Sequence, residues 1–222
     1  MSEDLVAVAG PVDGVAVLTI TRGQRKNALS IAVREQMSDA LDRFALDDAF
    51  RVVVITGEGD AFSAGFDLDE FAHPELADEL WASSDRWHRT LLEFPLPLVA
   101  AVNGAAYGGG FDLAVMCDLR IAASTARFAH PEHSFSQVVY GPLHDLVGGA
   151  VARDLALTGR GVDADEAERF GLVSRVVSPD DLLAEATATA TKIALAPRDV
   201  LLAMIAKIRR RAGITPGATL DL

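Results

Sequence analysis

The stretch "PLVAAVNGAAYGGGFDLAVMCDLRIAA", residues 97–123, joins two apolar runs through three consecutive glycines. The first run, 97–104, is typical of a fully buried strand that ends at the glycines, and the second run favours a helix. Residues 118–123 then predict another short strand. Because buried strands without polar alternation belong to parallel sheets covered by helices, this stretch predicts an α/β fold.

The same alternation of strand and helix continues on both sides. Strands are expected at 14–21, 51–57 and 172–177, and helices at 31–46, around Trp81 and Trp87, at 164–170, about 180–194 and 197–212. Ser30 is placed to cap the helix that begins at residue 31, and Asp163 is placed to cap the short helix that Gly171 ends. No linker or low-complexity tract divides the chain.

Composition excludes several classes of protein. The 32 acidic and 20 basic residues give a net charge of −12, which argues against a nucleic-acid or membrane partner. The single cysteine, Cys117, cannot form an internal disulfide, and the N-terminus "MSEDLVAVAG" carries acids where a signal peptide carries basic residues. No apolar run approaches the roughly 20 residues that cross a bilayer. These features predict a cytoplasmic protein.

Motif searches leave the backbone around the glycines as the candidate site. The chain lacks a dinucleotide fingerprint, a phosphate loop, a nucleophile elbow and zinc-ligand spacing, so we expect no cofactor and no metal. Glycines let a ligand approach the main chain, and the first N–H groups of a helix can bind partial negative charge. The triplet Gly-Phe-Asp occurs at 65–67 and again at 110–112, so two similar turns could face one another. Alternatively, the glycines only permit tight packing and Asp112 only caps its helix.

Four ordered motifs resemble the crotonase superfamily, also called the enoyl-CoA hydratase/isomerase family. They are "RGQRKNALS" (22–30), "FSAGFDLDEF" (62–71), "PLVAAVNGAAYGGGFDLAVMCDLRIAASTARFAHPE" (97–132) and "LTGRGVDADEAERFGLVSRVV" (157–177). The resemblance implies a spiral of ββα units, with a core domain at 1–195 and a shortened C-terminal helical segment at 196–222. It also implies an acyl-CoA partner, with coenzyme A as part of the substrate, and a homotrimer or hexamer.

The resemblance assigns roles to residues by position. The backbone N–H groups of Phe66 and Gly109 correspond to the donors of the family's oxyanion hole. Asp112 and Glu132 hold the places of the two glutamates that activate water and move the proton in the family's hydratases. Aspartate is one methylene shorter than glutamate, so Glu132 is the stronger acid/base candidate. Contacts to coenzyme A are implied for Arg25, Lys26, Ala28, Ala64 and Asp67, with Asp67 also shaping its loop.

The resemblance predicts addition of water to a 2-enoyl-CoA as the function, and two alternatives stay open. Further catalytic candidates are His130, His133, His144 and Tyr140, because some relatives are hydrolases of β-diketones or CoA thioesters that use His/Asp combinations. The segment after Glu132 departs from the family's glycine-rich pattern, which leaves the acyl group open. A catalytically weak acyl-CoA-binding protein is the other alternative. The basic run at 207–211 is either a second phosphate site or a solvated helix end.

Overall fold

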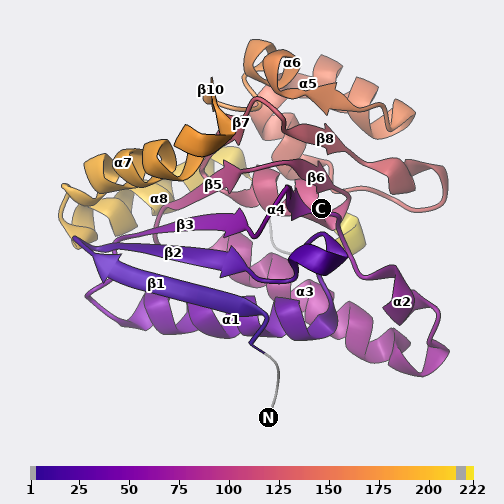
Figure 1. The fold of residues 1–222 in the computed structure, drawn as a ribbon, viewed down its shortest axis with the longest axis horizontal. Helices are drawn as coiled ribbons and strands as arrows, with labels where there is room; N and C mark the ends of the chain where they lie inside the picture. The colour runs from indigo at the N-terminus through magenta and orange to yellow at the C-terminus, as the bar shows by residue number, and fades with distance from the viewer. Residues whose placement is uncertain (1–3, 214–218) are drawn as a thin grey trace.

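The computed structural model describes residues 4–213 and 219–222, so residues 1–3 of the acidic N-terminus and 214–218 of the predicted C-terminal segment lie outside the described part. Two sheets organise the chain (Figure 1). The larger has six strands, in the spatial order β1 (Val6–Val12), β2 (Val15–Ile20), β3 (Val52–Gly57), β5 (Leu98–Val102), β7 (Leu119–Ala123) and β10 (Arg175–Val177). The smaller has four, in the order β4 (Ala61–Ser63), β6 (Ala105–Tyr107), β8 (Arg127–Ala129) and β9 (Val162–Asp163).

All strand pairs of the large sheet are parallel except β1 with β2. Helices α1 (Ile31–Leu46) and α3 (Ala77–Glu93) lie along one side of this sheet, and α7 (Leu182–Ala194) packs on β2, β3, β5 and β7. Successive strand residues alternate between the two layers: Val53 and Ile55 join the core that contains α1, whereas Val52 and Val54 join the core that contains α7. Both faces are therefore buried, which explains the apolar strands without polar alternation.

A repeated ββα unit builds the spiral that the family resemblance implies. Each unit has a strand in the large sheet, a short strand in the small sheet and a helix. Three units follow one another: β3, β4 and α3; then β5, β6 and α4 (Gly109–Met116); then β7, β8 and α5 (Gly141–Thr158). The remaining helices are α2 (Leu68–Phe71), α6 (Ala164–Phe170) and α8 (Arg198–Ala212). The predicted α/β class and crotonase-type spiral are confirmed.

Several sequence predictions hold closely and others need correction. The helix at 31–46 has the predicted bounds, and the Ser30 hydroxyl accepts from the Val33 N–H at 3.3 Å. The strand expected to run up to the triple glycine instead ends at Val102, and β6 lies between that strand and the glycines. Strands β1, β4, β6 and β9 and helix α5 were not predicted. Of these, β4, β6 and β9 have only two or three residues, too few for a periodicity that distinguishes a strand from a loop.

None of the helices in the described ranges is long and apolar enough to cross a membrane.

A buried asparagine attaches the segment before α1 to the loop between β3 and β4. The Asn27 side chain donates to the carbonyl oxygens of Glu58 at 2.9 Å and Ala61 at 2.7 Å, and it accepts from the Arg22 N–H at 3.1 Å. Asn27 is fully buried and has a φ of 55°, in the left-handed region that asparagine tolerates better than most residues. Its amide therefore satisfies three backbone groups at one crossing of the chain.

We expect Asn27→Ala to lower the free energy of unfolding by about 3 kcal/mol, because it leaves buried backbone groups without partners. Urea denaturation measures the loss. Asn103→Ala is the matched control: Asn103 also donates to Ala61, at 3.0 Å, but it is only half-buried, so water can replace it. A loss below about 1 kcal/mol is expected there. Equal losses in the two variants would contradict this account.

Candidate active site

The parallel order of the small sheet brings three loops to one edge. β6 pairs in parallel with β4 on one side and with β8 on the other. The carboxyl ends of parallel strands lie at the same edge of a sheet. Residues 64–67 after β4, 108–109 after β6 and 130–132 after β8 therefore converge, although up to 68 positions separate them in the sequence. This edge is the candidate site.

The two glycine turns lie against one another at this edge. Gly65 and Gly108 have φ angles of 92° and 51°, which an L side chain rarely adopts. A β-carbon on Gly65 would lie 3.2 Å from the Gly109 nitrogen and 2.6 Å from the Tyr107 carbonyl oxygen, so no side chain fits between the turns. The two similar turns expected from the sequence do face each other.

Two peptide N–H groups at these turns have no hydrogen-bond partner among the described residues. They belong to Phe66, in the first turn, and Gly109, at the start of α4. The first N–H groups of a helix have no intrahelical acceptor, which accounts for Gly109. A pair of such donors, on two loops that lie against one another, is suited to bind an oxygen that gains negative charge.

Beside these donors lies a buried histidine–carboxylate pair. Asp112 is in the first turn of α4, and its Oδ1 is 2.8 Å from Nε2 of His130, whose side chain is fully buried. The pairing explains how a carboxylate tolerates burial here, since the imidazole compensates for the lost solvation. Nδ1 of His130 is also buried and has no hydrogen-bond partner among the described residues.

Glu132 completes the cluster. It lies in the 3-10 turn Pro131–Ser134, and a β-carbon on Gly108 would lie 3.2 Å from each of its carboxylate oxygens. Asp112, His130 and Glu132 each have one side-chain oxygen or nitrogen atom within 4.8 Å of the other two. These residue types are also metal ligands, but the hydrogen bond to Asp112 occupies Nε2 of His130. The arrangement therefore fits proton transfer better than metal binding.

The cluster raises the pKa values of Glu132 and His130. Burial raises the pKa of Glu132, and the nearby Asp112 charge raises it further. Burial by itself lowers the pKa of His130, but the hydrogen bond and the charge of Asp112 outweigh burial, so the net shift is upward. A carboxyl group with a raised pKa can exchange a proton nearer to neutral pH than a free glutamate can.

Of the other three catalytic candidates, His133 lies at the edge of this cluster, and Tyr140 and His144 lie apart from it. The His133 ring packs against Gly159 at the end of α5, and its Nδ1 is 3.2 Å from the His130 carbonyl oxygen. Tyr140 and His144 have their rings 5.5 Å apart and line a surface hollow of about 520 Å³ with Arg153. Within the described chain, no side-chain contact joins Tyr140 or His144 to Asp112 or Glu132.

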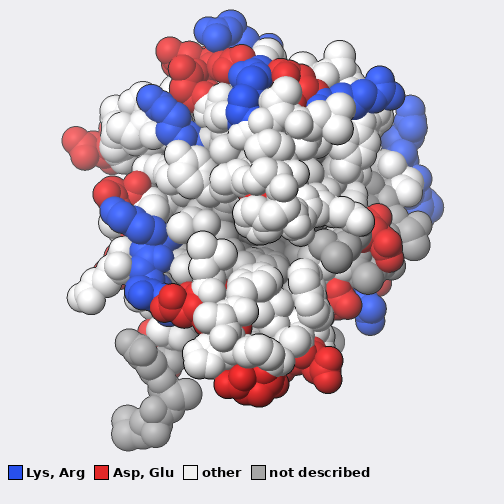
Figure 2. All heavy atoms as spheres, turned by 90° about the vertical axis from the view of Figure 1, so that its right-hand side faces the viewer, with Lys and Arg blue, Asp and Glu red and all other residues white. Residues whose placement is uncertain are grey.

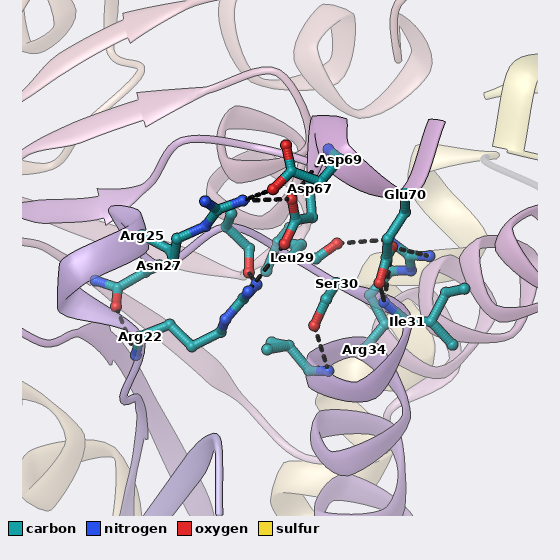
Figure 3. Close-up of polar contacts among 12 residues, drawn as sticks. Arg22, Arg25, Asn27, Leu29, Ser30, Ile31, Arg34, Asp67, Asp69 and Glu70 are labelled. Atoms are coloured by element: carbon teal, nitrogen blue, oxygen red, sulfur yellow. Dashed lines mark hydrogen bonds and ion pairs between the residues drawn. The ribbon is translucent and has the colours of Figure 1, made fainter. Parts of the chain in front are cut away.

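The predicted coenzyme-contacting segment borders the Phe66 turn, and its cations are paired; Figure 3 shows the pairing of Arg25. Lys26 Nζ is 2.8 Å from Asp60, and Arg25 pairs with Asp67 and Asp69. The two alanines of the prediction lie at the same junction, because the Ala64 N–H donates to the Lys26 carbonyl oxygen at 2.9 Å and the Ala28 carbonyl oxygen accepts from Arg22 at 2.8 Å.

Asp67 shapes its loop, as the sequence predicts. Its side chain caps α2 through the Asp69 N–H at 3.2 Å, and its second oxygen lies 2.9 Å from Arg22. Burial raises the pKa of Asp67, but the bonds from Arg22, the Asp69 N–H and Arg25 outweigh burial and lower it overall. Asp67 is therefore engaged with the protein.

Cys117 and the basic run at 207–211 lie at the opposite end of α4 from the site. Cys117 is buried, and burial raises the pKa of its thiol to about 12, which fits a packing role. In the basic run, Arg209 donates to the Glu93 carbonyl oxygen at 2.7 Å. At least this cation of the run therefore stabilises the end of α3.

Comparison with known proteins decides the family. The sequence model of the enoyl-CoA hydratase/isomerase family matches residues 11–219. The chain belongs to this family. The four motifs of this enoyl-CoA hydratase/isomerase family member, in their order, and its spiral of ββα units are therefore features of the family.

Individual members of the family are similar over most of the chain. The "Probable enoyl-CoA hydratase" of Mycobacterium tuberculosis is 45% identical over 184 residues, which are 81% of this chain and 71% of that protein. The crotonyl-CoA hydratase of Syntrophomonas wolfei is 39% identical over 186 residues, covering 81% and 72%. The crystal structure of an enoyl-CoA hydratase from Bacillus anthracis superposes with a TM-score of 0.89 at 30% identity, covering 95% of this chain and 84% of that one.

The His130–Asp112 pair predicts a pH-dependent stability in this family member. Because the pKa of His130 is raised by folding, the pair stabilises the fold fully below the pKa of a free histidine, about 6.5. That contribution is lost as the pH rises through the raised pKa. We expect His130→Leu to lower the free energy of unfolding by about 3 kcal/mol at pH 6 and by less at pH 9.

Urea titrations at the two pH values measure this difference. His144→Leu is the control, because His144 is exposed and no described side chain forms a hydrogen bond or ion pair with it. Its effect is expected to be small and the same at both pH values. A loss for His130→Leu that does not change between pH 6 and pH 9 would contradict a stabilising charged pair.

Proposed function

We propose that the protein adds water across the 2,3 double bond of a 2-enoyl-CoA thioester. The observation that carries the proposal is the pair of unpartnered N–H groups of Phe66 and Gly109 beside Glu132, a carboxyl group with a raised pKa. Membership of a family with a crotonyl-CoA hydratase 39% identical to this chain supports it.

The two N–H groups would bind the thioester carbonyl oxygen. As water attacks Cβ, electrons move from the double bond onto this oxygen and form an enolate. Donors fixed before the reaction stabilise that charge without reorganising, and removing one such donor typically costs about 2.7–4 kcal/mol of barrier lowering. The coenzyme part of the bound substrate would extend from the carbonyl along the segment that contains Arg25, Lys26 and Ala28. Ala64 and Asp67 lie beside this segment.

Glu132 would move the proton. Its carboxylate takes one proton from the water as the oxygen bonds to Cβ, and it returns a proton to Cα as the enolate collapses. The product is a 3-hydroxyacyl thioester, and the enzyme ends in its starting protonation state. Asp112 would orient the water with the oxygen that His130 does not hold. Because His130 fixes the Asp112 side chain, the shorter aspartate occupies one defined position.

The surface around this edge supports an uncharged acyl group. The side of the molecule on which α2 and the ends of β6 and β8 lie is seen face-on in Figure 2. Its recessed centre is mainly uncharged, and Lys, Arg, Asp and Glu side chains gather toward the rim. The exposed ring of Phe71 lies 6.5 Å from the Phe66 ring. An apolar acyl chain would lose less solvation there than a charged one.

A hydrolase of a CoA thioester or a β-diketone is the second candidate function. The observation that favours it is the hydrogen bond between His130 and Asp112, a pairing that orients a histidine base in other hydrolases. However, the His130 side chain is fully buried, and its free nitrogen does not reach the surface. Hydration by Glu132 is therefore the preferred proposal.

Glu132→Gln tests the hydratase proposal. We expect kcat for crotonyl-CoA, followed by loss of the enoyl absorbance, to fall at least about 100-fold, because general acid–base catalysis contributes roughly 10²–10⁴-fold. In the wild type, kcat/KM should fall as the pH decreases through the raised pKa of Glu132, above its ordinary 4.5.

Control reactions separate the candidates. Glu75→Gln removes an exposed carboxylate outside the site, which pairs only with His73 among the described residues, and should leave the rate unchanged. Release of free coenzyme A by the wild type, with no hydrated product, would favour the hydrolase. Tight binding of acyl-CoA with no turnover of any substrate would favour the binding protein.

We also propose that the protein acts as a homotrimer or hexamer. An exposed apolar stripe on α8 supports this: Val200, Met204 and Ile208, at a spacing of four, are 48%, 50% and 46% exposed. Such a stripe is typical of a face that another surface covers. We expect light scattering to give the mass of three or six chains, and Met204→Glu to shift it toward one. A monomeric wild type would contradict this assembly.

A further inference from the structure

A buried arginine lies behind the first of the two donor turns. Arg34 projects from the first turns of α1, and its side chain has no exposed area. Figure 3 shows it beside Leu29 and Glu70. Its Nε donates to the Ser83 hydroxyl at 2.8 Å, and Nη2 donates to the Leu80 carbonyl oxygen at 3.3 Å. Nη1 donates to the Leu29 carbonyl oxygen.

Packing alone gives a poor reason for a cation at this position. The nearest carboxylate oxygen, on Glu70, is 3.9 Å away, and the direct hydrogen bonds go to uncharged groups. Burial lowers the pKa of Arg34 to about 10, even though Glu70, Glu35 and Asp67 act in the opposite direction. Burying an ion of this kind is usually less favourable than an apolar side chain of similar volume. A contact that requires the guanidinium therefore needs to be identified.

That contact is with the ring of Phe66. The guanidinium carbon of Arg34 lies 4.5 Å from the centre of the ring, within the range of a cation–π interaction. The backbone is attached at the same place, because the Leu29 N–H donates to the Gly65 carbonyl oxygen at 2.8 Å. Arg34 therefore contacts the ring of Phe66 and also bonds to the backbone of Leu29, which pairs with the Phe66 turn.

The Phe66 ring also contacts the second donor turn. A β-carbon on Gly109 would lie 2.6 Å from Cδ1 and 2.7 Å from Cε1 of Phe66, so the ring occupies the space that a side chain at Gly109 would fill. The ring thus touches Arg34 and Gly109. The peptide N–H groups of Phe66 and Gly109 are the two donors described above, which have no hydrogen-bond partner among the described residues.

We infer that Arg34 is a positioning residue, which holds the Phe66 ring against Gly109 and thereby sets the separation of the two N–H groups that bind the substrate carbonyl. The inference rests on the proposed role of those N–H groups. Arg34 itself touches neither the carbonyl nor the reacting carbons in this scheme. Its loss should therefore reduce catalysis while leaving most of the binding energy of the thioester in place.

The test combines kinetics with a spectroscopic readout. Arg34→Met removes the cation and keeps an unbranched apolar side chain. We expect kcat for crotonyl-CoA to fall about 10- to 100-fold, since a displacement of about 1 Å can cost roughly 100-fold, with KM changed less than about threefold. A 4-aminocinnamoyl-CoA thioester absorbs at longer wavelength when its carbonyl is polarised. Its shift on binding should be smaller in Arg34→Met than in the wild type.

A double-mutant cycle assigns the effect to the ring. Phe66→Leu keeps the peptide N–H and removes the cation–π contact, so it should reproduce the loss in kcat. The double variant should be little worse than either single variant, because both remove one interaction. Arg34→Lys keeps a cation near the ring and should recover part of the rate and of the absorbance shift. This variant also serves if Arg34→Met does not fold.

Arg120→Met is the matched control. Arg120 is a second buried arginine whose guanidinium bonds to backbone carbonyl oxygens, including that of Leu172 at 2.6 Å, and it makes no described contact with Phe66. It should lose stability but keep kcat within about threefold below its melting temperature. An unchanged kcat and absorbance shift in Arg34→Met, or additive losses in the double variant, would overturn the inference.

The proposed hydration can fail separately from the positioning role. A wild type that shifts the absorbance of the cinnamoyl thioester without hydrating crotonyl-CoA would contradict the hydratase, and the Arg34 variants would still test the positioning role through the shift. A wild type that binds the thioester with no shift would overturn the positioning role.

Discussion

The parallel pairing of β4, β6 and β8 is the constraint on which the rest of the site depends. These strands have three residues each, yet their pairing places the Phe66 turn, the start of α4 and Glu132 at one edge. Strands this short contribute little stability by themselves. Each of them follows a strand of the large sheet within the same ββα unit, so the large sheet holds them in place.

Glycines convert this proximity into a usable geometry. A β-carbon on Gly65 would lie 2.6 Å from the Tyr107 carbonyl oxygen, so none fits between the two turns, and one on Gly108 would lie 3.2 Å from the Glu132 carboxylate. The two peptide N–H groups are therefore positioned by contacts between main chains and neighbouring side chains. Such contacts change little with side-chain rotamers. A site that stabilises developing charge needs this kind of rigidity, because donors that must reorganise lose much of their effect.

Buried charges surround the turns and fix the groups that act there. Asp112 is held by His130 on the side of the proposed proton transfer, and the Phe66 ring is held by Arg34 on the side of the proposed oxyanion donors. Each arrangement costs solvation energy that an apolar core would not cost. In return, each holds one side chain in a single position. The substitution of aspartate for the family's glutamate is consistent with this, because the side chain is shorter and is also tethered.

The fold class, the helix at 31–46 and the main parallel strands could be predicted from the sequence, and Phe66, Gly109, Asp112 and Glu132 could be named from it as site candidates. Periodicity reports long elements well, and motifs of consecutive residues identify a family. The sequence did not indicate β4, β6 or β9, because these strands are too short to show a period. It also could not find Arg34, because a charged residue beside Val33 on an amphipathic helix normally faces solvent.

Which candidates lie together could be seen only in three dimensions. It joined His130 to Asp112 and separated Tyr140 and His144 from them, and it showed that the cations near Arg25 are paired with acids. The physical reason is that hydrogen bonds, desolvation and ring contacts depend on distances of a few ångströms between residues far apart in the chain. Spacing along a sequence does not report those distances.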